Sequence, residues 1–547
     1  MNADVDREFV EPGSPRDDDV DVRRTALGRQ ASQRARVRDC RDRWAGFLDP
    51  LWRDRWLGAL VAVGTVAVWA VVAGWWTPRS PLTTGQALWS IVVSFIVGLA
   101  AGLVTRSRWA ILIAPVTFAA VFELTRVGAS GPTVDVIGTS TYGLYAFVVG
   151  RGFHALISLF PMAFGAVVGA GTARQLEPRT VPTAEHRRWP RYLRRSVAIL
   201  AAVGLVGFTA LLARPPSTDP ILDANGTTVP GSIAELSTVD INGHGLAMMI
   251  RGRSVDNPVL LFLAGGPGGS EMGAMRNHLP ALERHFTVVT WDQRGTGKSY
   301  DALDPTDTYT LAGAVDDTIA VTDYLRGRFG QDKIYLVGQS WGSTLGVLAV
   351  QHQPELFRAF IGAGQMVSQL GTDRIFYKDT LAWARKTGND GLADQLSAIG
   401  PPPYDRMLDY ETALAHEHDV YPYDHSGNSE GQGGFSENFF VSEYALIDQI
   451  HLLGAFMDTF SVLYPQLQNI DFRRTATSFT IPMFFVEGAH EADGRAQPFA
   501  EWYPMIQAPI KDLTTFNTSG HRPLWEQPDE FVDYMVNTVL AQTGERQ

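Results

Sequence analysis

A serine flanked by two glycines stands between an apolar run and a helical run, in the segment Gly338-Gln339-Ser340-Trp341-Gly342. This order of strand, sharp turn and helix is typical of a nucleophile elbow, in which a strained turn exposes the serine hydroxyl. A glycine on each side removes side chains that would collide within such a turn. The spacing therefore predicts that Ser340 is a nucleophile, and the alternative interpretation is an ordinary tight turn.

A serine hydroxyl is a weak nucleophile without an adjacent base, so a histidine is expected further along the chain. Of the 12 histidines, His521 has the most suitable position. It lies in the turn Ser519-Gly520-His521-Arg522-Pro523, after the apolar stretch Leu513–Phe516 and before a predicted C-terminal helix. We therefore expect His521 to be the base that accepts the serine proton.

The histidine needs a carboxylate that orients the imidazole and stabilises its protonated form. When the serine comes first along the chain, this acid lies between the serine and the histidine. The predicted strand Met483–Val486 leads into a loop that contains Glu491 and Asp493. Both carboxylates are candidates on this spacing.

The reaction also needs backbone N–H donors that stabilise the oxyanion. One donor is expected at Trp341, directly after the nucleophile. The other is expected in the loop Ala264-Gly265-Gly266-Pro267-Gly268-Gly269, which follows the predicted strand Val259–Leu263. So many glycines let the backbone approach a ligand closely.

Other kinds of site fit the sequence less well. The segment Gly295-Thr296-Gly297-Lys298-Ser299 ends like a phosphate-binding loop, but the first glycine of that pattern would fall at Asp292. His, Cys and carboxylate residues do not cluster at metal-ligand spacing in the sequence. The formal net charge of −12 argues against nucleic acid as a partner. We expect neither a metal nor another cofactor.

The elements around these motifs indicate an α/β fold over residues 238–547. Buried-type strands are predicted at the positions given at the end of this paragraph, with helical stretches such as Ala312–Phe329 between them. Apolar strands that alternate with helices indicate a mostly parallel sheet covered on both faces. Residues 366–478 interrupt this rhythm and predict a mostly helical cap, with one mobile loop at His425–Gly434. The predicted strands are Val259–Leu263, Thr287–Trp291, Ile334–Val337, Phe360–Ile361 and Met483–Val486.

The first 213 residues have a different character. Residues 1–56 are rich in Arg, Asp and Glu and predict a disordered tail. Long apolar stretches follow, each close to the length that crosses a bilayer core of about 30 Å, and residues 214–237 predict a linker. The only cysteine, Cys40, lies in the tail. The five predicted spans are residues 57–76, 86–105, 109–125, 152–173 and 196–213.

Arginine placement predicts the orientation of these spans. Arginines crowd into the tail, into the loop between spans two and three, and into the loop between spans four and five, whereas the other loops hold few. Because positive charge is retained in the cytoplasm, the tail is expected inside. Five crossings then place residues 238–547 on the extracytoplasmic side of a cell membrane. The lipid bilayer is therefore an expected partner, and the oligomeric state is left open.

Four sequence blocks resemble the proline iminopeptidase family of serine peptidases. The resemblance covers about Thr238 to Leu540 and does not include the apolar half. It implies an α/β-hydrolase fold with a helical cap. A departure is Ala264, where the family has histidine. The blocks are Gly265–Gly268, similar to the family's oxyanion loop, Asp292–Ser299, similar to its second signature, Gly338–Gly342, similar to its elbow, and Ser519–His521, similar to its histidine loop.

The resemblance implies roles by position. Ser340 would be the nucleophile and His521 the base. Glu491 stands three residues after Gly488, at the family's acid position, but the family usually has aspartate there, so Asp493 stays an alternative.

The resemblance further implies that the oxyanion donors are the backbone N–H groups of Gly266 and Trp341. Family peptidases bind the free amino terminus of the substrate with carboxylates of the cap, and by approximate position these would be Glu437 and Glu443. The alternative for both glutamates is ordinary cap surface or a buried ion pair.

These observations lead to three hypotheses. The first is a membrane-anchored exopeptidase that releases an N-terminal residue, such as proline, from short peptides by acyl transfer. The second is an esterase or lactonase on the same scaffold, because a fold does not fix the substrate. The third is a catalytically silent membrane sensor or binding protein.

Overall fold

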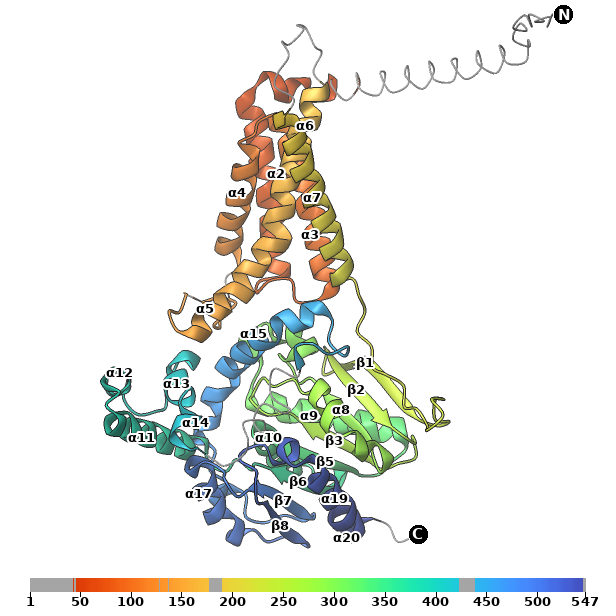
Figure 1. Cartoon of the computed structure of the whole chain (residues 1–547), viewed down its shortest axis with the longest axis vertical. Helices are drawn as coiled ribbons and strands as arrows, with labels where there is room; N and C mark the ends of the chain where they lie inside the picture. The colour runs from red at the N-terminus through yellow and green to blue at the C-terminus, as the bar shows by residue number, and fades with distance from the viewer. Residues whose placement is uncertain are drawn as a thin grey trace, which may run out of the picture.

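The computed structural model describes residue 43 and residues 46–126, 128–135, 137–176, 189–422 and 438–544. It has two parts, which we call the bundle (residues 55–212) and the sheet domain (residues 233–544), and one long helix of the sheet domain, α15, lies between them (Figure 1). Most of the predicted tail, the predicted loop His425–Gly434 and Glu437 lie outside the described residues.

A helix occupies each of the five predicted spans. Four stretches are long and apolar enough to cross a membrane by length and composition, namely Arg55–Trp76, Thr84–Thr105, Thr141–Leu176 and Tyr192–Leu212, and a fifth such stretch, Leu446–Asn469, belongs to the cap. The helix of the third predicted span is shorter, with 16 residues. The bundle helices are α2 (Arg55–Trp76), α3 (Thr84–Thr105), α4 (Ala110–Thr125), α5 (Thr141–Phe147), η1 (Val148–Gly152), η2 (Ala155–Leu159), α6 (Phe160–Leu176) and α7 (Trp189–Leu212).

Small residues let α3 and α6 approach closely. A Cβ atom added to Gly98 would lie 1.9 Å from Met162 O, and one added to Gly165 would lie 2.1 Å from Phe95 O. Such contact between backbones is the usual way in which apolar helices pack when small residues repeat every four positions.

The sheet domain is built on eight strands in the order β1-β2-β4-β3-β5-β6-β7-β8. All five predicted strands are present, and strands β3 to β8 run parallel. The antiparallel hairpin of β1 and β2 was not predicted, and β1 begins within the predicted linker. The strands are β1 (Ile233–Ile241), β2 (His244–Gly252), β3 (Val259–Leu263), β4 (Thr287–Trp291), β5 (Ile334–Gln339), β6 (Phe357–Ala363), β7 (Met483–Gly488) and β8 (Lys511–Phe516).

The central strands are apolar on both faces because helices cover both sides of the sheet. Along β3, Val259, Leu261 and Leu263 belong to one core, whereas Leu260 and Phe262 belong to the other. This alternation explains why the strands appear in the sequence as uninterrupted apolar runs. The covering helices are α8 (Met272–His278), η3 (Pro280–Arg284), α9 (Leu311–Phe329), α10 (Trp341–His352), α17 (Asp493–Trp502), α18 (Pro523–Glu526), α19 (Pro528–Tyr534), η10 (Met535–Leu540) and α20 (Ala541–Thr543).

The described residues of the insertion between β6 and β7 are mostly helical, as predicted, and form a cap over the carboxyl ends of the strands. Its last long helix, α15, runs along the underside of the bundle (Figure 1). The cap helices are α11 (Gln369–Thr387), α12 (Asp390–Ile399), α13 (Met407–Leu414), α14 (Glu417–Val420), α15 (Leu446–Leu463), η8 (Tyr464–Asn469) and α16 (Phe472–Thr475). Shorter helical turns elsewhere in the domain are η4 (Gly297–Leu303), η5 (Thr306–Thr308), η6 (Pro354–Leu356) and η9 (Tyr503–Met505).

Candidate active site

Ser340 lies in the turn between β5 and α10, with φ 53° and ψ −120°. A residue other than glycine at positive φ is strained by roughly 1–3 kcal/mol, and such strain is typical of functional turns. The flanking glycines are required by space. A Cβ atom on Gly338 would lie 2.3 Å from Gly342 O, and one on Gly342 would lie 2.0 Å from Leu263 O. The turn is therefore the elbow that the sequence predicts.

His521 comes from the loop after β8 and faces this elbow. Its Nε2 lies 2.9 Å from Ser340 Oγ, although the two residues are 181 positions apart. The loop is held by Glu526, which accepts hydrogen bonds from the backbone N–H groups of Gly520 and Arg522 at 2.6 and 3.0 Å. The imidazole is thus placed to accept the serine proton.

Glu491 is the carboxylate that meets His521. Its Oε2 lies 2.6 Å from His521 Nδ1, whereas Asp493 is exposed at the start of α17. Burial disfavours the charge on Glu491, but Arg495 and His521 outweigh it and lower the pKa of Glu491 to about 2. The acid is therefore ionised at neutral pH and can stabilise a protonated imidazole.

Arg495 is a member of the site that the sequence analysis did not identify. Its Nε donates to Glu491 Oε1 at 2.7 Å, and its Nη2 pairs with Glu417 of cap helix α14. Glu491 precedes α17 by two residues and Arg495 lies in its first turn, so their spacing of four residues across a predicted helix start is a signal that could have indicated the contact. Because of this pair, the acid of the triad is also bound to the cap.

The glycine-rich loop after β3 lies against the nucleophile. A Cβ atom on Gly265 would lie 3.3 Å from Ser340 Cβ, and Gly266 has φ 123°, a conformation that favours glycine. Gly266 and Trp341 line the same cavity as Ser340. Their backbone N–H groups are thus available beside the serine for an oxyanion, as the resemblance implies.

The segment Asp292–Ser299 stabilises these loops and does not form a phosphate site. Gln293 accepts a hydrogen bond from Trp341 Nε1 at 2.9 Å and donates one to Ala264 O at 3.2 Å. Asp292 accepts from Lys298 N at 2.8 Å and from Tyr444 OH at 2.9 Å. Burial raises the pKa of Asp292 to about 7.

A cavity of about 320 Å³ opens above Ser340, between the sheet and the cap. Aromatic cap side chains form its roof and include Phe376, Phe456, Phe460 and Tyr464. Two acidic residues, Glu271 and Asp373, also line it. The cavity can therefore hold a small apolar group and a polar or cationic one.

The two acidic residues differ in whether a neighbouring cation neutralises the carboxylate. Glu271 pairs with Arg522, with 2.6 Å between Oε1 and Nη2. Asp373 accepts hydrogen bonds only from neutral groups among the described residues, namely Tyr464 OH at 2.5 Å, Gln468 Nε2 at 3.0 Å and Gln369 Nε2 at 3.2 Å. Burial raises the pKa of Asp373 to about 6. Asp373 is thus the cavity carboxylate without a neighbouring cation in the described chain.

Of the two predicted cap glutamates, the structure describes Glu443 and does not place it at this cavity. Glu443 is fully buried and paired with Arg276, which is the alternative that the sequence analysis left open. Glu437 lies outside the described residues. The place of a residue in the cap cannot be inferred from its sequence position in related proteins, because it depends on the path that the inserted chain follows.

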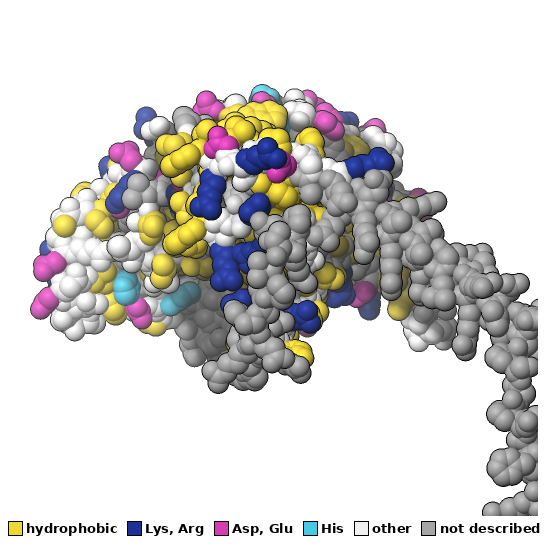
Figure 2. Space-filling model, turned by 90° about the horizontal axis from the view of Figure 1, so that it is seen from above, with side chains coloured by type: hydrophobic (Ala, Val, Ile, Leu, Met, Phe, Trp, Pro, Cys, Tyr) yellow, Lys and Arg dark blue, Asp and Glu magenta, His cyan; other side chains and the backbone are white. Residues whose placement is uncertain are grey.

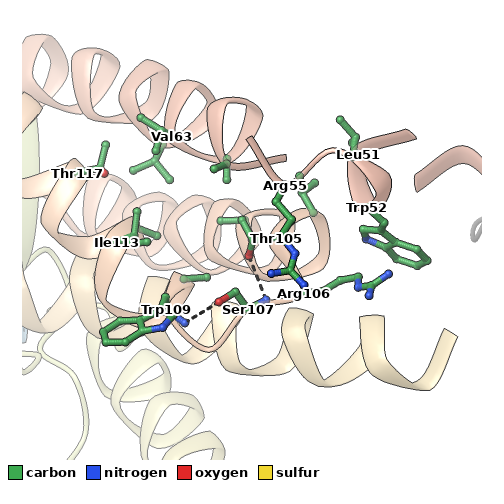
Figure 3. A pocket seen from close by; sticks show the side chains of 17 residues that line it. Leu51, Trp52, Arg55, Val63, Thr105, Arg106, Ser107, Trp109, Ile113 and Thr117 are labelled. Atoms are coloured by element: carbon green, nitrogen blue, oxygen red, sulfur yellow. Dashed lines mark hydrogen bonds between the residues drawn. The ribbon is translucent and has the colours of Figure 1, made fainter. Parts of the chain in front are cut away.

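A second, larger cavity of about 490 Å³ lies at the end of the bundle remote from the sheet domain (Figure 3). Arg55, Arg106, Trp52 and Trp109 line it together with several alanines and valines. It contains no serine–histidine pair, so the smaller cavity is the candidate active site. Among the described residues, no three His, Cys, Asp or Glu side chains could hold a metal ion together.

Comparison with known proteins finds similarity to α/β-hydrolases and to aminopeptidases. Residues 258–388 match the family described as the alpha/beta hydrolase fold. A probable aminopeptidase of Bacillus subtilis, YbaC, is 29% identical over 313 residues, which cover 55% of this chain and 95% of that protein. A proline iminopeptidase of Xanthomonas citri is 39% identical over 103 residues, 19% of this chain and 30% of that protein. A solved proline iminopeptidase of Mycobacterium smegmatis aligns with a TM-score of 0.41 at 20% identity, covering 56% of this chain and 98% of the other.

The sheet order, the elbow and the family match together show that the sheet domain has the α/β-hydrolase fold. It is a hydrolase whose relatives include aminopeptidases and proline iminopeptidases at modest identity. The family match does not extend to the bundle.

The contacts of His521 predict which acid is needed. We expect Glu491→Gln to lower kcat by about 10²- to 10⁴-fold, because the amide no longer stabilises the imidazolium. Asp493→Asn, at the exposed neighbouring position, is the matched control and should keep its activity. Ester hydrolysis by the purified full chain measures both, and a loss in Asp493→Asn with none in Glu491→Gln would reverse the assignment.

Proposed function

We propose that this chain is a membrane-anchored serine hydrolase that releases the N-terminal residue from short peptides. The observation that carries the proposal is the triad of Glu491, His521 and Ser340, whose histidine and serine line a cavity that also contains a carboxylate without a paired cation among the described residues. The relatives with aminopeptidase names add support at the level of the class.

The geometry supports acyl transfer. Ser340 Oγ attacks the carbonyl carbon while His521 accepts its proton, and the negative oxygen forms beside the N–H groups of Gly266 and Trp341. When the intermediate collapses, His521 returns the proton to the departing amine. A water molecule then attacks the acyl carbon while His521 accepts its proton, and His521 returns that proton to Ser340 Oγ as the acyl group leaves.

Asp373 is the group that we propose binds the free ammonium group of a substrate. It is buried, it lines the cavity, and no ion pair neutralises it within the described chain. A buried charge without a partner is unfavourable, so a cationic ligand is stabilised there. The aromatic roof then packs against the side chain of the first residue, which suits a small apolar residue such as proline.

An esterase is the second candidate, and one observation favours it. Asp373 already accepts three hydrogen bonds, which reduce its capacity to bind an ammonium group. The triad of Ser340, His521 and Glu491 supports acyl transfer from an ester by the same steps as from an amide.

We further propose that the bundle crosses the membrane five times and leaves the sheet domain outside the cytoplasm. Lys and Arg side chains gather at the end of the bundle remote from the sheet domain (Figure 2). At the other end, Arg126 and Arg151 pair with Glu123, and Arg79 pairs with carboxylates. The excess of positive charge at the remote end supports a cytoplasmic tail. The arginines near that end are Arg53, Arg55, Arg106, Arg108, Arg174, Arg194 and Arg195.

The nucleophile is tested with a fluorophosphonate probe and with aminoacyl arylamides. We expect the full chain in detergent to be labelled and to release arylamine, and we expect Ser340→Ala to lose both. Ser397→Ala changes an exposed serine of α12 and is the matched control. Retention of full activity in Ser340→Ala would eliminate the mechanism, and turnover of acyl esters alone would favour the esterase.

The role of Asp373 is tested by pH. Its pKa of about 6 means that the charge is present above this pH and is lost as the pH falls through it. We expect the ratio of kcat/KM for aminoacyl arylamides to kcat/KM for esters without an amine to decline below pH 6, because only the arylamides need the charge on Asp373. Taking the ratio removes the titration of the triad, which affects both substrates equally. Asp373→Asn should lower the ratio by at least about tenfold and make it independent of pH. Asp394→Asn, exposed on α12, should leave it unchanged.

The topology is tested with the single cysteine of the chain. In intact cells, a membrane-impermeant maleimide should not label Cys40 until the cells are permeabilised. A Cys40→Ser, Lys386→Cys variant moves the thiol to an exposed position of α11 and should be labelled at once. The reverse pattern, or labelling of both variants in intact cells, would contradict five crossings with an internal tail.

A further inference from the structure

One arginine of the bundle is buried against the sheet domain. Arg79 lies in the link between α2 and α3, and its side chain is fully buried. Its Nε and Nη2 donate to the two carboxylate oxygens of Asp304 at 2.9 and 3.1 Å, and its Nη1 donates to Asp458 at 2.5 Å. A further bond to Ser130 O at 2.6 Å joins a second loop of the bundle. This guanidinium therefore joins segments that are 225 and 379 residues apart in the sequence.

Asp458 is the centre of the contact. Its side chain is completely buried in α15 and accepts hydrogen bonds from Arg79, from Tyr300 OH at 2.6 Å, and from Thr133 N and Oγ1 at 3.0 and 2.5 Å. Arg79 and Thr133 belong to loops of the bundle, whereas Tyr300 belongs to the sheet domain. Breaking a buried pair by removing one partner leaves a charge without compensation, which is strongly unfavourable.

The same helix forms part of the active site. Phe456 and Phe460 of α15 line the cavity above Ser340. They stand two positions before and after Asp458, which places them near the opposite side of the helix from it. A Cβ atom on Gly268 would lie 2.7 Å from Phe456 Cα, so the loop that supplies Gly266 packs directly on the backbone of α15. The position of α15 thus determines both the roof of the cavity and the support of the oxyanion loop.

Other contacts along α15 hold it to the bundle. His451 Nε2 donates to Pro81 O at 3.1 Å, in the same link that contains Arg79. Ile447 packs in one apolar cluster with Ile91 of α3 and Leu212 of α7. The first half of α15 is therefore bound to the bundle by packing and by the hydrogen bond of His451, and its second half by the ion pair between Arg79 and Asp458.

We propose that Arg79 is a positioning residue of the hydrolase site: through Asp458 it fixes α15, while Asp304 holds the guanidinium in place, so that the bundle sets the shape of the cavity where the substrate binds. This inference rests on the proposed function of the Ser340 site. On this inference the bundle helps to shape the active site in addition to anchoring the chain. Arg79 acts through α15 and does not contact the reacting atoms.

The test compares Arg79→Met with Arg251→Met in the full chain in detergent. Arg251 is also buried and paired with a carboxylate, Glu283, at 2.6 Å, but the pair joins β2 to η3 and does not involve α15. We expect Arg79→Met to raise the KM for aminoacyl arylamides by about tenfold, while the rate of fluorophosphonate labelling at Ser340 stays near that of the wild type. Arg251→Met should change neither quantity, and Arg79→Lys should recover part of the KM.

Hydrogen exchange gives a readout that does not need catalysis. We expect faster exchange across residues 446–463 in Arg79→Met and not in Arg251→Met. Unchanged exchange and KM in Arg79→Met, or an equal KM increase in Arg251→Met, would overturn the proposal.

If Arg79→Met does not fold, Asp304→Asn decides, because Asp304 is partly exposed and its loss is milder. An unaltered KM and unaltered exchange in that variant would also overturn it. Absence of labelling and turnover in the wild type would instead refute the proposed function, while exchange would still report on Arg79.

Discussion

The imidazole of His521 makes two hydrogen bonds on which the chemistry of the molecule depends. One reaches Ser340 at 2.9 Å and the other reaches Glu491 at 2.6 Å, and the three residues come from loops after three different strands of one sheet. Their convergence requires parallel strands, because parallel strands bring their carboxyl ends to the same edge of the sheet. The register of β5, β7 and β8 is therefore a catalytic constraint as well as a structural one.

The surroundings of Glu491 show how the cap participates in this constraint. Arg495 neutralises the buried carboxylate and at the same time binds Glu417 of α14. The acid of the triad is thereby connected to the cap, and the roof of the cavity is connected to the bundle through α15. Catalytic and binding groups are thus held from two directions, from the sheet below and from the helices above.

Much of the site could be predicted from the sequence because its key residues have local signatures. Ser340 lies in a five-residue pattern, and His521 lies in a short loop after an apolar strand, so both could be placed without the fold. Spacing could not choose between Glu491 and Asp493, since the two are separated by one residue and only the start of α17 turns Asp493 to solvent. The hairpin of β1 and β2 had a signal that was not used, because Asn242-Gly243 is a typical two-residue turn and both residues have positive φ.

The contacts between distant segments could not be predicted. Nothing in the sequence near Arg79 indicates that its partners are Asp304 and Asp458. The insertion also has no regular apolar repeat from which the position of Asp373 at the cavity could be predicted. Glu443 was predicted to face the substrate, but it is buried against Arg276, because the cap follows a path that spacing alone does not encode. Packing in three dimensions decided these positions.

The pairing of β6 with β7 also limits how the apolar stretches of this chain can be counted. Helix α15 lies in a segment, Leu446–Asn469, that is long and apolar enough to be mistaken for a crossing. Were it one, the strand beginning at Met483 would emerge across the bilayer from Phe360, to which it is hydrogen-bonded in register. The nucleophile would then be separated from its own base by the thickness of a membrane. The pairing of β6 with β7 thus argues against α15 as a crossing, although its length and hydropathy alone would count it as one.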